Sequence, residues 1–226
     1  MSKKKPRSAA SKVEMTRDLV LLTADRNMEA AVSAIANRTG SLKIREVSFD
    51  SVVHPQRDPG CYRTSPGLLA SYRTTHARCL VVFDRVGCGA EQLSREELEA
   101  EVDAQLEKTG WKCRAVIVID PELENWVWGR SPHVATVLGW VNPQQEVRQW
   151  LLEQGFLADA AQVKPDRPKE AMEAVLKKVR QPRSSSICRA LAERVTLEGC
   201  TEPSFVKLCL TLRHWFSVRS ESPQSS

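Results

Sequence analysis

The sequence lacks any hydrophobic run long enough to cross a membrane. Its longest apolar runs, such as residues 19–22 and 115–119, fall far short of the ~20 residues that a transmembrane helix needs. The N-terminal stretch is basic but contains no apolar segment of the kind that defines a secretory signal. These two absences predict a cytoplasmic protein that has no membrane partner.

Paired cysteines are also missing. The seven cysteines are scattered, odd in number and free of any C-x-x-C pair, and several of them lie within apolar runs. This pattern favours reduced, buried thiols over a disulfide framework or a structural zinc site. Because the four histidines show no ligand spacing either, we do not expect a metal site built from histidine and cysteine.

A complete phosphate-binding glycine motif is absent as well. The loop at residues 86–89 contains two glycines, but it lacks the Lys-Ser/Thr pair of a P-loop and the third glycine of a dinucleotide fingerprint. ATP hydrolysis and NAD chemistry are therefore disfavoured.

The chain does contain enough apolar residues for an α/β domain with a helical appendage. Its 226 residues are 42% hydrophobic and 27% charged, which is ordinary for a globular protein. We expect a disordered basic arm at residues 1–16, an α/β core at 17–130, a helical C-terminal part at 131–216 packed on that core, and a flexible tail at 217–226.

Three apolar runs predict strands, and each is closed by an aspartate. Residues 18–24, 79–83 and 115–119 are rich in aliphatic side chains, as expected of strands that are buried on both faces. A more amphipathic run at residues 42–49 is a candidate for the second strand. A capping box at Ser94 predicts a helix between the last two runs, so the strand–helix–strand repeat favours a sheet that is at least partly parallel.

The remaining helices are predicted from helical spacing and from end signals. The stripe of Met28, Val32 and Ile35 predicts a helix that ends near Gly40, whereas the prolines and glycine of residues 54–61 predict a loop. Beyond residue 128 the strand signal stops. Further helices are predicted at residues 66–72, 144–152, 168–179, 186–195 and 203–216.

Acidic residues stand at the ends of the three apolar strands. Asp25, Asp84 and Asp120 follow the three runs directly. Because ligands of parallel sheets bind at the carboxyl ends of the strands, we expect these side chains to lie at one site. Carboxylates without histidine or cysteine partners suit Mg²⁺ or Mn²⁺, and phosphodiester cleavage is the natural reaction class for such a site.

Each acid also has a purely structural interpretation. Asp25 stands where a helix N-cap belongs, Asp84 precedes a glycine turn, and Asp120 precedes a proline that commonly starts a turn. Glu122 and Glu124 lie two positions apart, so at most one of them is expected to point into the site.

The charges are distributed unevenly. Residues 1–17 carry the whole net excess of +5, while residues 84–130 contain eleven acids and six bases, and residues 164–219 contain twelve bases and six acids. This asymmetry suits an acidic metal site facing a basic strip that holds a polyanion, and it suits two solvated helix faces equally well. The candidate residues for nucleic-acid contact are Lys177, Lys178, Arg180 and Arg183.

Several short motifs surround the acids. They are Asp25 with Glu29, the pair Phe83-Asp84, the runs at residues 84–89, 120–128, 164–171 and 182–187, and the residues Leu191, Cys200 and Phe205. With these motifs the chain resembles, over about residues 18–216, the TOPRIM-like proteins of bacterial defence loci, including the RloB-like group. It is more closely similar to a small component of the methylation-associated anti-phage defence system.

The resemblance implies a TOPRIM-like α/β fold, a partly parallel sheet flanked by helices, and Mg²⁺-dependent nuclease chemistry on DNA or RNA alongside other defence proteins. Together with the strand-end acids it predicts catalytic roles for Asp25, Glu29, Asp84 and Glu124. The predicted ligands of Mg²⁺ or Mn²⁺ are Asp84, Glu124, Glu122 and Asp120.

Two positions depart from the family pattern. The first-strand acid of the family is usually glutamate, where this chain has Asp25, and the middle motif is Asp-x-Asp, where this chain has Val86 in place of the second acid. The alternative to a nuclease is therefore a non-catalytic sensor or assembly subunit that binds nucleic acid or other defence components.

Overall fold

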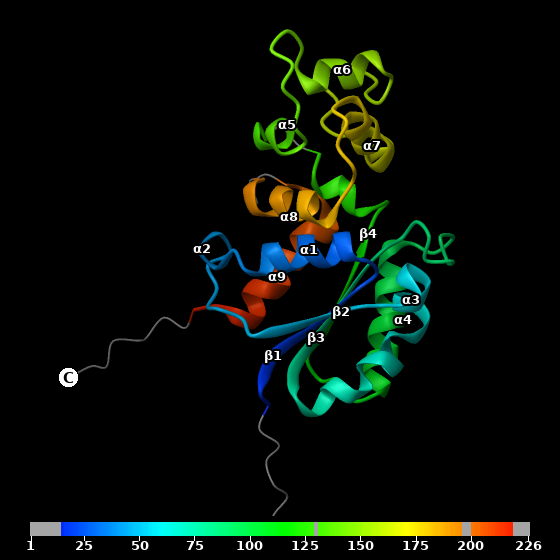
Figure 1. Ribbon diagram of the computed structural model, residues 1–226. Helices are drawn as coiled ribbons and strands as arrows, with labels where there is room; N and C mark the ends of the chain where they lie inside the picture. The colour runs from blue at the N-terminus through cyan, green and yellow to red at the C-terminus, as the bar shows by residue number, and fades with distance from the viewer. Residues whose placement is uncertain (1–14, 129–130, 196–199, 219–226) are drawn as a thin grey trace, which may run out of the picture.

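The computed structural model describes residues 15–128, 131–195 and 200–218. The predicted basic arm at residues 1–16 and the predicted tail at 217–226 therefore lie almost entirely outside the described residues. The described part contains an α/β sheet flanked by helices (Figure 1). None of its helices combines the length and the apolar character that a membrane span requires.

The sheet has four parallel strands in the order β2-β1-β3-β4. Its members are β1 (Arg17–Thr23), β2 (Phe49–Val53), β3 (His76–Asp84) and β4 (Arg114–Ile119). The three continuous apolar runs form β1, β3 and β4, and the residues at 19–22, 79–83 and 116–119 are almost completely buried. This burial on both faces confirms the interpretation of the runs.

Helices cover both faces of the sheet. In Figure 1, α1, α8 and α9 lie on one side, whereas α3 and α4 lie on the other, and α5, α6 and α7 gather at one end of the molecule. The helices are α1 (Arg26–Ala36), α2 (Thr39–Leu42), α3 (Arg57–Leu69), η1 (Ala70–Thr74), α4 (Arg95–Lys108), η2 (Leu123–Trp126), α5 (His133–Val137), α6 (Val147–Glu153), α7 (Pro168–Lys178), α8 (Ser185–Arg194) and α9 (Pro203–Phe216).

After β2, the direction in which successive strands are added to the sheet reverses. From β1 it moves to the edge strand β2, and it then crosses back over β1 to reach β3 and β4. Right-handed crossovers in opposite directions place their helices on opposite faces, as α1 and α3 are placed here. The carboxyl ends of β1 and β3 therefore border a topological switch point, where α/β sheets bind ligands.

Two predicted elements are wrong. The second strand was expected at residues 42–49, but Leu42 ends α2 and the strand spans Phe49–Val53. This edge strand is only partly buried, so its apolar pattern is weak. The predicted loop at residues 54–61 is largely the start of α3, because a proline is tolerated in a first helical turn. Gly60 allows that turn to pack, since a Cβ there would overlap the His54 ring.

Candidate functional site

Acidic residues from all four strand ends meet at the carboxyl edge of the sheet. Thr23 of β1 lies opposite Val82 of β3, so Asp25 and Asp84, each two residues further along, leave their strands at the same level. Asp58 follows β2, and the acids of residues 120–124 follow β4. The parallel topology thus brings together side chains that are about 100 positions apart in the sequence.

Asp84 is the centre of this group. Its Oδ1 atom is shielded from solvent and has no hydrogen-bond partner within the described chain. Burial raises the pKa of Asp84 well above its usual value, and the negative charges of Asp58, Glu124, Asp25 and Glu122 raise it further. We call these five residues the acid cluster. The cluster concentrates negative charge around one oxygen that no protein donor satisfies.

Asp58 is the member that the sequence did not predict. It lies in the first turn of α3, and its Oδ1 accepts a hydrogen bond of 2.8 Å from the backbone N–H of Asp84. Burial raises the pKa of Asp58, the charge of Asp25 adds to this effect, and Lys169 opposes it. Because the prolines and glycine of residues 54–61 predict a loop, no strand or helix signal connects Asp58 with the strand ends.

Asp25 has two roles in the structure, whereas Glu29 faces elsewhere. Asp25 is the N-cap of α1, accepting a 2.8 Å hydrogen bond from the Met28 N–H, and it also belongs to the acid cluster. The Oε1 atom of Glu29 accepts a 2.8 Å hydrogen bond from Ser51 of β2. The structural interpretation of Asp25 as a helix cap is thus confirmed, and it does not exclude a place in the site.

Glu124 is buried and paired with a cation. Only 2% of its side chain is exposed, and its Oε1 contacts the Nη2 of Arg183. Burial disfavours the charge on Arg183, but Glu124 and Asp25 outweigh burial and raise the pKa of Arg183 above its usual value. Arg183 therefore supplies positive charge inside the acid cluster, rather than on an open basic strip.

Glu122 borders a cleft beside the cluster. Burial raises its pKa, while Lys169, whose Nζ lies 3.7 Å from Glu122 Oε1, acts in the opposite direction. The cleft has a volume of about 340 Å³ and lies between the turn after β4 and the start of α7, where Glu122, Lys169 and Glu173 line it. Glu122 lines this cleft and Glu124 does not, whereas the charges of both carboxylates raise the pKa of Asp84.

Asp120 lies in a different environment from the other predicted ligands. Its Oδ1 is 2.9 Å from the Nε of Arg85, and 41% of its side chain is exposed. The following peptide bond to Pro121 is cis. The structure thus places Asp84, Glu122 and Glu124 in the acid cluster and pairs Asp120 with a neighbouring arginine.

The glycine loop folds around an acid of its own. Gly87 and Gly89 have φ angles of 92° and 79°, which glycine adopts readily, and their N–H groups donate to Glu91 Oε1 at 2.9 and 3.1 Å. These donors are therefore already used by Glu91. Val86, at the position without a carboxylate, is 44% exposed.

The four basic residues predicted for nucleic-acid contact separate into two groups. Lys177 and Lys178, in the last turn of α7, and the nearby Arg180 are exposed. Arg183 is half-buried and contacts Glu124. The first three are free to meet a polyanion at the surface, whereas the fourth lies at the cluster.

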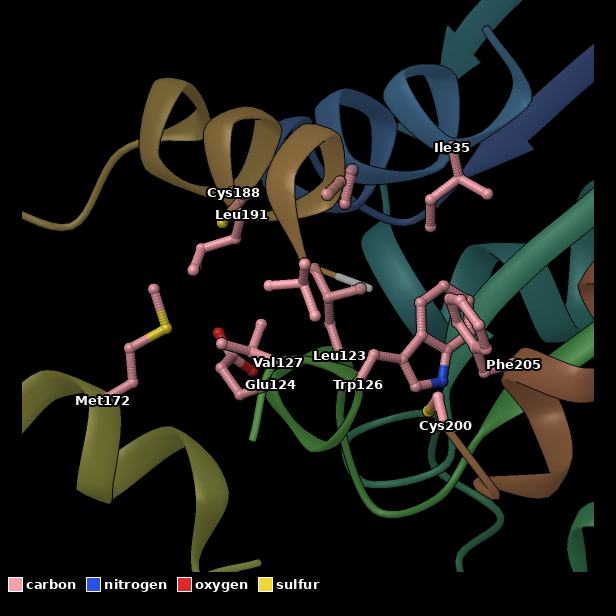
Figure 2. A pocket seen from close by; sticks show the side chains of 13 residues that line it. Ile35, Leu123, Glu124, Trp126, Val127, Met172, Cys188, Leu191, Cys200 and Phe205 are labelled. Carbon is pink, nitrogen blue, oxygen red and sulfur yellow. The ribbon is translucent and has the colours of Figure 1, made fainter. Parts of the chain in front are cut away.

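Trp126 anchors the turn that carries Glu124. Its Nε1 donates to Glu202 Oε2 at 2.8 Å and to Ser204 Oγ at 2.9 Å, and its ring packs edge-on against Phe205 at 5.4 Å. Figure 2 shows Glu124 and Trp126 beside an apolar cavity between α1, α7, α8 and α9. That cavity measures about 40 Å³, far below the size of a nucleotide site, so it is a packing gap.

The donor chemistry of the cluster fits a hard divalent cation, because every candidate donor is a carboxylate oxygen and Asp84 Oδ1 lacks a partner. In residues 15–128, 131–195 and 200–218, however, no three His, Cys, Asp or Glu side chains are arranged to hold a metal ion together. The side chains of the cluster would therefore have to move in order to bind a cation. In this structure, Arg183 supplies the positive charge that balances Glu124.

Comparisons with known proteins do not extend this description: no family model, curated protein or solved structure matches the chain.

Proposed function

We propose that this protein is a TOPRIM-like, metal-dependent nuclease or phosphoryl-transfer effector that acts on nucleic acid as a cytoplasmic component of a bacterial anti-phage defence system. The observation that supports this most directly is the acid cluster, in which the charges of carboxylates from separate strand ends act on Asp84, whose Oδ1 is buried and unpartnered. Such a cluster is costly for folding, since it holds like charges together away from water. A bound divalent cation would offset that cost.

The residues divide into cation ligands and phosphate ligands. Asp84, Glu124 and Glu122 would hold Mg²⁺ or Mn²⁺, and Asp25 would be a further ligand or the base that accepts a proton from the attacking water. The cation, when bound, polarises a phosphoryl oxygen and neutralises charge on the leaving oxygen. Lys169 and Arg183, which both contact cluster carboxylates, would turn to a substrate phosphate in the cleft.

The test is cleavage of mixed DNA and RNA with and without Mg²⁺ or Mn²⁺. We expect cleavage that requires the cation and that falls at least about a hundredfold in Asp84→Ala and Glu124→Ala. Glu107→Ala is the matched control, because Glu107 is an exposed carboxylate near the amino end of β4, where it pairs with Arg114. Cation-dependent cleavage that survives both cluster substitutions would contradict the assignment.

One observation favours a second function, that of a non-catalytic sensor or assembly subunit that binds nucleic acid or other defence proteins. Arg183 already neutralises Glu124, so the cluster has a built-in cation. If this is its permanent state, Arg183→Gln will destabilise the fold by about 3–5 kcal/mol by leaving Glu124 unpaired, and Mg²⁺ will not restore the stability. If the nuclease proposal is right, Mg²⁺ will restore much of that loss in a thermal unfolding assay.

A further inference from the structure

The crossover from β2 to β3 contributes a carboxylate to the same edge of the sheet as the other three strands. Asp58 lies in the first turn of α3, and its Oδ1 accepts a hydrogen bond from the N–H of Asp84 at 2.8 Å. The Asp58 carboxylate is therefore held beside Asp84, whose own Oδ1 is buried and has no hydrogen-bond partner. Val86, on the loop after β3, is an exposed apolar residue and supplies no donor.

We propose that Asp58 is a ligand of the divalent cation in the acid cluster. This inference rests on the proposed function and adds to it a residue from the β2 crossover. With Asp58, each of the four strand ends supplies an oxygen donor: Asp25 after β1, Asp58 after β2, Asp84 on β3, and Glu122 or Glu124 after β4. A set of four or more oxygens is what Mg²⁺ and Mn²⁺ need beside water and substrate phosphate.

The chemistry of the site argues against a purely structural role for Asp58. The hydrogen bond from Asp84 needs only an oxygen acceptor, and the amide oxygen of asparagine would supply it without charge. The carboxylate instead lies in a partly buried position, with its Oδ1 at the backbone of Asp84, whose own side-chain Oδ1 is buried and unpartnered.

Asp58→Asn separates the two roles, because it keeps the size and the acceptor oxygen while removing the charge. The full-length protein would be titrated with Mn²⁺ by calorimetry, alongside Asp84→Asn and the matched control Glu107→Gln. Thermal unfolding of every variant would be recorded in EDTA. We expect Asp58→Asn to weaken Mn²⁺ binding at least about tenfold. We also expect its midpoint in EDTA to be no lower than that of the wild type, since asparagine keeps the acceptor oxygen for the Asp84 N–H.

The outcomes are distinct. If Asp58→Asn binds Mn²⁺ as the wild type does while Asp84→Asn does not, Asp58 is not a ligand, and the proposed cation site at Asp84 is retained. If Asp58→Asn loses both Mn²⁺ affinity and thermal stability in EDTA, Asp58 is a structural residue and the inference is likewise overturned. If the wild type and Glu107→Gln bind no Mn²⁺ or Mg²⁺ at all, the proposed metal-dependent function fails, and the inference fails with it.

Discussion

Among single residues, Asp84 shows how strongly the environment changes a carboxyl group. Its pKa is raised well above the usual value by burial and by four neighbouring acids. Between the pKa of the unfolded chain, about 3.9, and the raised pKa of the folded protein, the folded state binds the proton more tightly. The stability that this proton contributes is therefore lost as pH rises through that interval.

Asp84→Asn should remove this pH dependence. In EDTA, we expect the variant to unfold at a higher temperature than the wild type, and the difference in Tm to widen by about 2 °C or more between pH 5 and pH 8. Circular dichroism melts at several pH values measure this directly. A difference in Tm that stays constant with pH, or that narrows as pH rises, would show that Asp84 is already ionised in the folded protein.

At the level of elements, the short helix η2 and the long helix α9 are tied together by one buried indole. Trp126 donates to Glu202, the N-cap of α9, whose Oε2 also accepts a 2.9 Å hydrogen bond from the Phe205 N–H. Since Glu124 is two residues before Trp126, this tie also fixes the turn that carries a proposed ligand. No local pattern in the sequence predicts this contact, because the two residues are 76 positions apart.

Trp126→Phe should keep the aromatic packing on Phe205 but leave the buried Glu202 with one donor fewer. We expect a loss of about 1–3 kcal/mol in the free energy of unfolding, measured by urea titration. Trp150→Phe is the control, because Trp150 is a partly buried indole on α6 that packs on Trp140, away from Glu202. Equal losses in the two variants would mean that ring area, and not the hydrogen bond, holds η2 to α9.

The elements that could be predicted are those whose signals are local. Asp25 and Ser94 cap α1 and α4 as expected, the capping box at Ser94 is complete, and α9 has the predicted bounds. The failures lie between β1 and β3, where an edge strand is only half-buried and a helix begins with proline and glycine. Because the sequence predicts a loop at residues 54–61, Asp58 is not among the predicted site residues.

The composition of the site was harder to predict than its location. Parallel topology alone places strand-end acids at one edge of the sheet, and Asp25, Asp84, Glu122 and Glu124 all follow or end strands at that edge. The pairing of Arg183 with Glu124 joins positions 59 apart, through packing that no sequence period reports. Likewise, Asp120 follows a strand in the same way as Asp84, yet a neighbouring arginine takes its charge.

For the molecule as a whole, α7 connects the acid cluster with an exposed basic surface. Lys169, in its first turn, contacts Glu122, and Lys177 and Lys178 stand in its last turn. Lys177 lies eight positions after Lys169, a distance of about 12 Å along the helix axis. Figure 1 shows α7 grouped with α5 and α6 at one end of the molecule, beyond the sheet. A single strand of nucleic acid bound along α7 would therefore lead into the cleft at Glu122.

If nucleic acid follows this path, Lys177 and Lys178 contact phosphates, and their loss should change the salt dependence of binding. We expect the Lys177→Ala, Lys178→Ala double variant to reduce the slope of log K against log salt by about 1.4 for single-stranded DNA or RNA. Fluorescence anisotropy between 50 and 200 mM NaCl, in EDTA to prevent cleavage, measures that slope. The matched control is Lys108→Ala with Lys112→Ala, two exposed lysines at the end of α4 and just beyond it. Equal slopes in the two double variants would place the polymer elsewhere, because phosphate contacts release counterions only where the lysines touch the strand.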